Sequence, residues 1–162
     1  EITDAIQYLI DKDFVVNSHI VEGWWKDTGK LSDILEANQM ILAEITTELE
    51  SEPGRGSEVH GSVRTGKKVK IEGSVLRGPC VIGSGASIID SYIGPFTSIG
   101  PNTRVVGSEV ENSIILEDCA IENIGSRIGN SLVGRNVTIA RNDRPPRSYE
   151  FMVGDNSNII IF

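Results

Sequence analysis

The chain has 162 residues, with 15 Lys and Arg against 23 Asp and Glu, and its formal net charge is 15 minus 23, or −8. This acidic balance argues against a protein that grips the phosphate backbone of nucleic acid. The sequence contains no apolar run long enough for a membrane span and no signal-peptide pattern. We therefore expect a cytoplasmic protein with neither nucleic acid nor a membrane as its partner.

Residues 1–50 combine helical and extended patterns. The predicted elements are a short helix capped by Thr3 or Asp4, strands at 14–16 and 20–21, and a second helix over 31–49 with Ser32 as its N-cap. So few elements cannot enclose a core of their own, and the chain begins with Glu1 rather than Met. We therefore interpret residues 1–50 as the C-terminal segment of an α/β domain whose earlier part lies outside this sequence.

A periodic pattern dominates residues 61–141, after a turn-rich linker at 51–60. An aliphatic residue returns there every five to seven positions. The series is Val63, Val69, Val75, Ile82, Ile88, Ile93, Ile99, Val105, Val110, Ile115, Ile121, Ile128, Val133 and Ile139. Amphipathic helices would space apolar residues by three and four, and a sandwich would space its strands by about 8–12 residues. The pattern therefore predicts a mainly β fold, a parallel β-helix whose short rungs stack about 4.8 Å apart.

The predicted corners of this β-helix contain turn-forming residues. Gly94-Pro95 and Gly100-Pro101 are expected to supply the backbone angles of two corners, and five-residue intervals near Ser91 and at 111–113 indicate tightened ones. The only two cysteines are Cys80 and Cys119, which lie beside inward positions without metal-ligand spacing, so we expect small buried thiols. Residues 142–162 break the repeat and are predicted to form a tail that caps one end.

The repeat units resemble the left-handed parallel β-helix of hexapeptide acyltransferases and sugar-nucleotide pyrophosphorylases. The left hand is implied by that resemblance alone, because crossover connections in general are right-handed. Before the repeat stands Gly23-Trp24-Trp25-Lys26-Asp27-Thr28-Gly29, flanked by Glu1-Ile2-Thr3-Asp4-Ala5-Ile6-Gln7 and Leu35-Glu36-Ala37-Asn38. These stretches resemble the end of the catalytic domain of the sugar-1-phosphate nucleotidylyltransferases, most closely its long-form glucose-1-phosphate thymidylyltransferase group.

The resemblance implies an enzyme that joins a nucleoside triphosphate to a sugar 1-phosphate and releases pyrophosphate. It assigns Asp27 a catalytic role as one of two carboxylates that bind Mg²⁺, because hard oxygen ligands suit this ion. It places Trp25 and Glu1 near the sugar and gives Thr28 and Gly29 the shaping of the loop. The motif spelling favours dTTP and glucose 1-phosphate, with other bases and sugars open. The family's glycine-rich triphosphate loop is absent from the sequence, so we expect this chain alone to be inactive.

Two other interpretations stay open. A hexapeptide β-helix could transfer an acetyl group from acetyl-coenzyme A with a His as general base, and His60, at a Gly-flanked corner, is the better candidate of the two histidines. Alternatively, the β-helix serves only to assemble a homo-oligomer, a trimer or a tetramer. Asp27 has a simpler interpretation too, since Asp-Thr-Gly forms tight turns without any chemistry.

Overall fold

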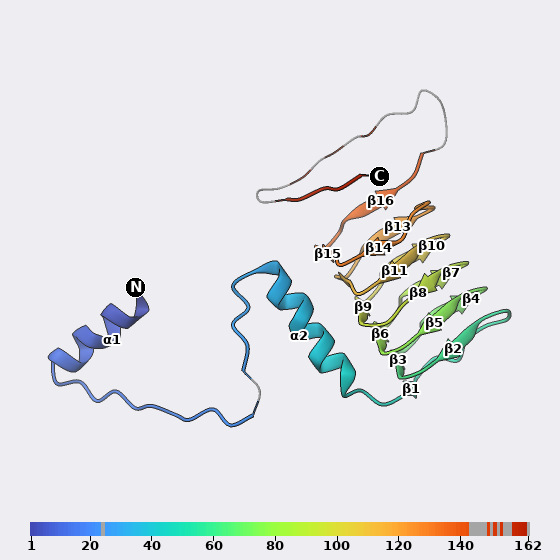
Figure 1. The fold of residues 1–162 in the computed structure, drawn as a ribbon. Coiled ribbons are helices and arrows are strands. Elements are labelled where there is room, and N and C mark those ends of the chain that lie inside the picture. Colours follow the sequence, from blue (N-terminus) through green and yellow to red (C-terminus); the bar gives the residue numbers. More distant parts are fainter. Residues whose placement is uncertain (24, 143–148, 150, 152, 154–156, 162) are drawn as a thin grey trace.

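The computed structural model describes residues 1–23, 25–142, 149, 151, 153 and 157–161. Two helices, α1 (Ile2–Asp11) and α2 (Leu31–Ala43), precede a series of short strands (Figure 1). The strands are β1 (Glu48–Leu49), β2 (Glu58–His60), β3 (Val63–Thr65), β4 (Lys70–Glu72), β5 (Val75–Arg77), β6 (Cys80–Ile82), β7 (Ser87–Ile89), β8 (Tyr92–Ile93), β9 (Thr97–Ile99), β10 (Arg104–Val106), β11 (Glu109–Glu111), β12 (Ile114–Ile115), β13 (Ala120–Glu122), β14 (Ile128–Gly129), β15 (Leu132–Val133) and β16 (Thr138–Ala140).

The strands form three parallel sheets around one core. Sheet A has the order β1-β3-β6-β9-β12-β15, sheet B β14-β11-β8-β5-β2, and sheet C β16-β13-β10-β7-β4. Each neighbour within a sheet is therefore the third strand before or after along the chain, apart from β1 and β3 at the start. This order is that of a three-sided solenoid, which confirms the predicted parallel β-helix. Its hand stays a prediction, because strand order is the same for either hand.

The coil length explains the irregular aliphatic spacing. Val63 pairs with Cys80 and Ile71 with Ile88, each 17 residues further along the chain. A strict six-residue repeat on three sides would give 18 residues, so one side of such a coil is a residue shorter. Ser91 is buried and lies on that short side, as predicted from the five-residue interval.

The core consists of the inward aliphatic side chains stacked in columns. Ile88, Ile93, Val105 and most of the predicted series are buried. Two rungs differ, because Ile71 is the central residue of β4 and Leu76, not Val75, points into the core from β5. Both cysteines are buried and unpaired with each other, which confirms their predicted place in the core.

The corners use residue types other than those predicted. Left-handed backbone angles fall on Phe96 (φ 59°) and Asn102 (φ 56°), the residues after the two prolines, and not on the preceding glycines. Gly100 serves close approach instead, since a Cβ there would lie 2.5 Å from the backbone N of Glu117 in the next coil. The Gly-Pro pairs therefore fit one coil against the next, and the positive φ angle is taken by the residue that follows.

Buried hydroxyls join successive coils at one corner. The hydroxyl of Ser74 accepts the N–H of Ser91 at 3.1 Å and donates to the carbonyl of Glu72 at 2.7 Å. The same two bonds recur one coil later, where the hydroxyl of Ser91 accepts from Ser108 and donates to Ile89. Each hydroxyl thus satisfies a corner N–H that the strand ladders leave unpaired.

The front segment differs from its predicted elements. Residues 14–16 and 20–21 form no strand, because the described chain offers them no strand to pair with. Helix α2 ends at Ala43, before the β-branched run Ile45-Thr46-Thr47, and Glu48–Leu49 become β1 beside β3. The N-caps are Glu1 and Lys30 in place of the predicted residues. The division at 51–60 stays a prediction, although β1 and β2 already belong to the solenoid sheets.

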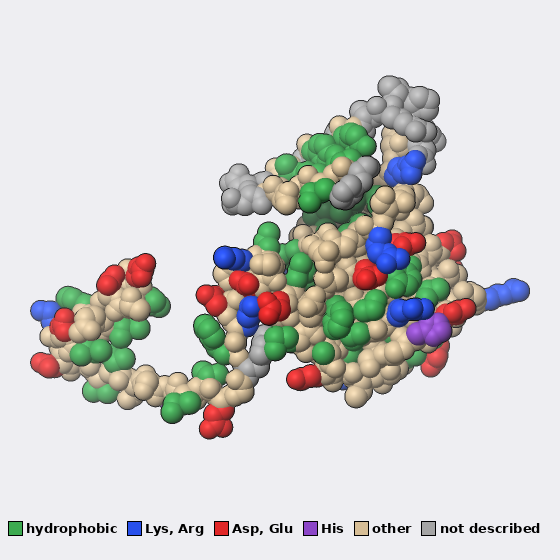
Figure 2. Space-filling view, in the orientation of Figure 1, with side chains coloured by type: hydrophobic (Ala, Val, Ile, Leu, Met, Phe, Trp, Pro, Cys, Tyr) green, Lys and Arg blue, Asp and Glu red, His purple; other side chains and the backbone are tan. Residues whose placement is uncertain are grey.

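Helix α1 buries no residue, and Figure 2 shows its hydrophobic side chains on the surface. No helix in the described part of the chain is long and apolar enough to cross a membrane. The predicted capping tail lies largely outside the described residues. Its described apolar side chains are exposed, namely Tyr149, Phe151, Val153, Ile159, Ile160 and Ile161.

We expect Ile88→Ala to lower the free energy of unfolding by about 2–5 kcal/mol, because it leaves a cavity between stacked rungs. Ile88 is 0% exposed, whereas its half-buried neighbour Ile89 points outward from the same strand. Ile89→Ala is the matched control, with an expected loss of no more than about 1 kcal/mol. Chemical denaturation followed by circular dichroism measures both, and equal losses would contradict the inward assignment.

Gly100→Ala should cost about 1–3 kcal/mol of stability, because the added Cβ meets backbone atoms of the next coil. A Cβ on Gly134 would meet nothing within 4 Å. Gly134→Ala should therefore be neutral or stabilise by about 0.4–1 kcal/mol through the unfolded state. The test is the difference in thermal midpoint between the two variants, and a tolerated Ala at 100 would argue against close coil contact there.

Burial raises the pKa of the Cys80 thiol from 9.0 to about 12. The stability contributed by this neutral thiol is fully present below pH 9, where the unfolded thiol is also protonated, and is lost as pH rises to 12. Between pH 8 and 10.5, the free energy of unfolding should therefore fall more steeply for the unaltered chain than for Cys80→Ala. Parallel curves in urea titrations at the two pH values would show that Cys80 is not shielded from water.

Candidate functional site

The predicted site residues Trp25, Asp27, Thr28 and Gly29 lie in one exposed loop that leads into α2. Trp24 is outside the described residues. The carboxylate Oδ1 of Asp27 accepts the backbone N–H of Gly29 at 3.1 Å, so Asp-Thr-Gly does form a tight turn. This bond occupies one carboxylate oxygen and leaves the other directed by the turn. Trp25 is 72% exposed, which leaves its ring available to a partner.

Lys26 fastens this loop to α2. Its Nζ lies 2.6 Å from Oε2 of Glu36 and 3.8 Å from Oδ1 of Asp33. The hydrogen bond from Glu36 is the main cause of the raised pKa of Lys26. The ammonium group is thus engaged with the helix and does not stand free for a phosphate in this arrangement.

Helix α2 in turn docks on sheet A of the solenoid (Figure 1). The side-chain amide of Asn38 donates to the carbonyl of Phe96 at 3.0 Å, and its oxygen accepts from Ser98 at 2.6 Å. Gln39 donates to the side chain of Asn112 at 2.6 Å, and Leu42 is buried. The position of the loop relative to the solenoid is therefore set through α2.

Glu1 is not brought to the other predicted site residues. Its backbone ammonium group pairs with Asp4 at 2.7 Å, and Glu1 caps α1. Figure 1 shows α1 separated from α2 by an extended segment. A sugar contact of Glu1 near Asp27 therefore finds no support in this arrangement.

His60 lies at the end of strand β2, not at the corner predicted from its glycine neighbour. Its side chain is about half exposed, and Nε2 lies 3.0 Å from Oε2 of Glu58. A carboxylate can orient an imidazole in this way, but among the described residues no enclosed cavity adjoins the pair. Its role as an acetyltransferase base stays a prediction.

The fit of Mg²⁺ to the loop can be tested on the donor atoms. Mg²⁺ keeps several waters and takes one or two protein carboxylates together with substrate phosphates. Asp27 provides one such exposed carboxylate, with one oxygen outside the turn bond. Among the described residues, no group of three or more His, Cys, Asp or Glu side chains could hold a metal ion. Asp27 therefore suits a single ligand, and a partner carboxylate would have to come from elsewhere.

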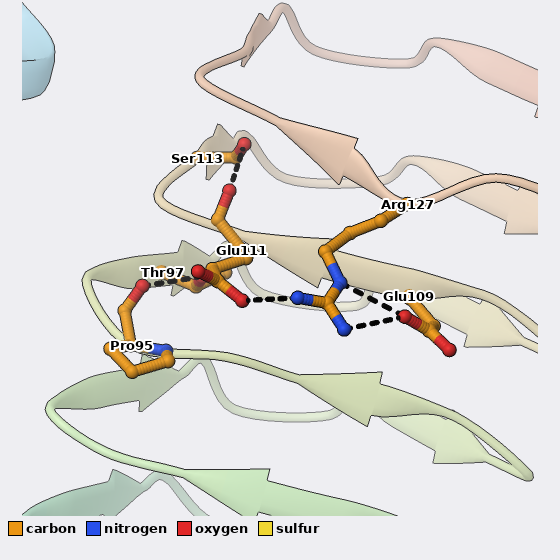
Figure 3. Close-up of polar contacts among 6 residues, drawn as sticks. All are labelled: Pro95, Thr97, Glu109, Glu111, Ser113 and Arg127. Atoms are coloured by element: carbon orange, nitrogen blue, oxygen red, sulfur yellow. Dashed lines mark hydrogen bonds and ion pairs between the residues drawn. The ribbon is translucent and has the colours of Figure 1, made fainter.

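A network of charged side chains lies on sheet B. The guanidinium group of Arg127 pairs with Glu109 at 2.9 Å and Glu111 at 2.8 Å and stacks over the ring of Tyr92 (Figure 3). These acids raise the pKa of Arg127. The signal in the sequence is an acid 16 or 18 residues before the base, about one coil. A polar cavity of about 490 Å³ adjoins the network, but its Arg donors are already occupied by the two acids.

Comparison with known proteins finds relatives along nearly the whole chain. It is 43% identical over 161 residues to glucose-1-phosphate thymidylyltransferase of Streptomyces antibioticus, covering 99% of this chain and 45% of that protein. It is 41% identical over 162 residues to low-salt glycan biosynthesis nucleotidyltransferase Agl11 of Haloferax volcanii, covering 98% and 45%. It is 37% identical over 150 residues to bifunctional protein GlmU of Methanocaldococcus jannaschii, covering 88% and 35%.

The chain thus spans less than half the length of these relatives. No protein-family model matches it. The identity nonetheless extends over both the front segment and the solenoid, in agreement with the resemblance carried by Trp25-Lys26-Asp27-Thr28-Gly29. The chain is a homologue of the glucose-1-phosphate thymidylyltransferases over the part of those enzymes that it spans.

Proposed function

We propose that this chain is the C-terminal part of a sugar-1-phosphate nucleotidylyltransferase that forms a nucleoside diphosphate sugar and pyrophosphate. The supporting observation is the 43% identity to a glucose-1-phosphate thymidylyltransferase over 99% of the chain. That relative's name makes dTTP and glucose 1-phosphate the first substrates to test. The chain alone is inactive in this proposal, since the triphosphate-binding residues belong to the part of the protein outside it.

Asp27 supplies one carboxylate to Mg²⁺ in this proposal. The bound ion would neutralise the phosphate charges that the reaction brings together. The turn bond from Gly29 holds the carboxylate, so that one oxygen keeps a fixed direction. Thr28 and Gly29 shape the turn, and the exposed Trp25 ring offers an apolar face to the sugar.

The solenoid acts in the same proposal as a support and assembly module. Its rungs leave outward side chains on sheets B and C, and the described tail residues add exposed apolar surface. Flat parallel sheets with apolar additions favour contacts between copies of the chain, and a trimer or a tetramer would be formed. Acetyl transfer has no comparable support, because His60 lies on an exposed strand.

We expect Asp27→Asn to lower pyrophosphate release by the full-length protein by about 100-fold or more, or roughly 2.7 kcal/mol. Asn keeps an oxygen that can accept the N–H of Gly29, so the variant removes the charge and retains the turn. The assay measures pyrophosphate from dTTP and glucose 1-phosphate with Mg²⁺.

Asp13→Asn is the matched control. Asp13 is exposed, lies in the same front segment and has φ 60°, which Asn adopts readily. This variant makes the same change of charge and should retain full activity. Equal activity of the two variants would remove Asp27 from the metal site. Absence of release with every triphosphate tested would overturn the nucleotidyl transfer proposal itself.

A further inference from the structure

Lys26 differs from its neighbours in the candidate site loop. Among the described residues 21–30, it alone is not fully exposed, and 27% of its side-chain surface remains accessible. A lysine side chain normally stays mobile in water because ordering it costs conformational entropy. Here two carboxylates of α2 hold it, which fixes the backbone immediately before Asp27.

The contacts form a continuous path from the loop to the solenoid. Lys26 binds Glu36 at 2.6 Å, two residues before Asn38 on α2. Asn38 contacts the solenoid through both atoms of its amide, at the carbonyl of Phe96 and the hydroxyl of Ser98. The path therefore consists of directional polar contacts at both ends, which fix an orientation and not merely a separation.

The ion pair contributes little to overall stability by comparison. Glu36 is 55% accessible, and ion pairs of this exposure are weak and screened by salt. Its effect is on the position of its neighbour: Asp27 is the next residue, and its free carboxylate oxygen is aimed by the same backbone. A displacement of about 1 Å at a catalytic group can lower a rate by roughly 100-fold.

We infer that Lys26 is a positioning residue, which holds the Asp27 turn against α2 and so places the metal-binding carboxylate relative to the solenoid. This inference rests on the proposed nucleotidyl transfer. It gives Lys26 no contact with substrate, because its ammonium group is directed to Glu36 and Asp33. The requirement is for a cation that pairs with an acid on α2, whichever residue carries each charge.

The test uses the full-length protein and pyrophosphate release, with Mg²⁺ titrated at saturating substrates. Lys26→Met should lower kcat roughly 10- to 100-fold and raise the Mg²⁺ concentration for half-maximal rate, with the thermal midpoint nearly unchanged. Lys26→Arg should keep most of the activity. The charge exchange Lys26→Glu with Glu36→Lys should recover activity that either single change loses. Lys67→Met, at an exposed solenoid lysine without an ion pair in the described structure, is the control and should behave as the unaltered protein.

The outcomes separate the two proposals. If the unaltered protein releases pyrophosphate and Lys26→Met matches it, the positioning role is wrong while nucleotidyl transfer stands. Loss of activity in Lys26→Met without recovery in the charge exchange would also overturn the inference, since it would indicate direct use of the ammonium group. If the unaltered protein releases none with any triphosphate, the proposed function fails first.

Discussion

Stacking of one coil on the next, residue over residue, constrains every other feature of this chain. Parallel strands leave each N–H and carbonyl to be satisfied by the coil above or below, so the length of a coil is fixed by hydrogen bonding before any side chain is chosen. A coil of 17 residues brings Val63 over Cys80 and Ile71 over Ile88. The core columns follow from this register, and so do the buried hydroxyls that take up the corner N–H groups.

The same register prepares the surface on which α2 rests. Corners with a left-handed residue turn backbone carbonyls and amide side chains outward, as at Phe96 and Asn112. Asn38 and Gln39 bind these groups, while Leu42 supplies apolar contact. Apolar burial holds a helix against a sheet without fixing its rotation, whereas amide hydrogen bonds have a preferred direction. The polar residues in the middle of an otherwise apolar helix face thus determine how the helix lies.

The sequence period predicted the solenoid because backbone stacking enforces it. It misplaced the inward residue of β5, Leu76, because the preceding coil has the polar residue Thr65 at an inward position and the aliphatic count slips there. The apolar pattern from Leu31 suggested one long helix, but β1 adds Glu48 and Leu49 to the open edge of sheet A, a tertiary interaction that local pattern does not contain. The turn at Asp27 was predictable from its three letters. The ion pair of Lys26 was not, because two exposed charges ten residues apart show no preferred partner in a sequence.

The arrangement of the front segment follows from how few of its contacts are apolar. Helix α1 and residues 14–21 bury nothing in this chain, so their positions are not fixed by packing against the solenoid. The loop at Asp27 lies between that unanchored part and the well-anchored α2. Only side-chain contacts toward α2 can then define where the carboxylate stands, and Lys26 provides them. A rigid repeat domain can hold a distant loop in this way without touching it, provided that the connecting helix is bound by directional contacts at both ends.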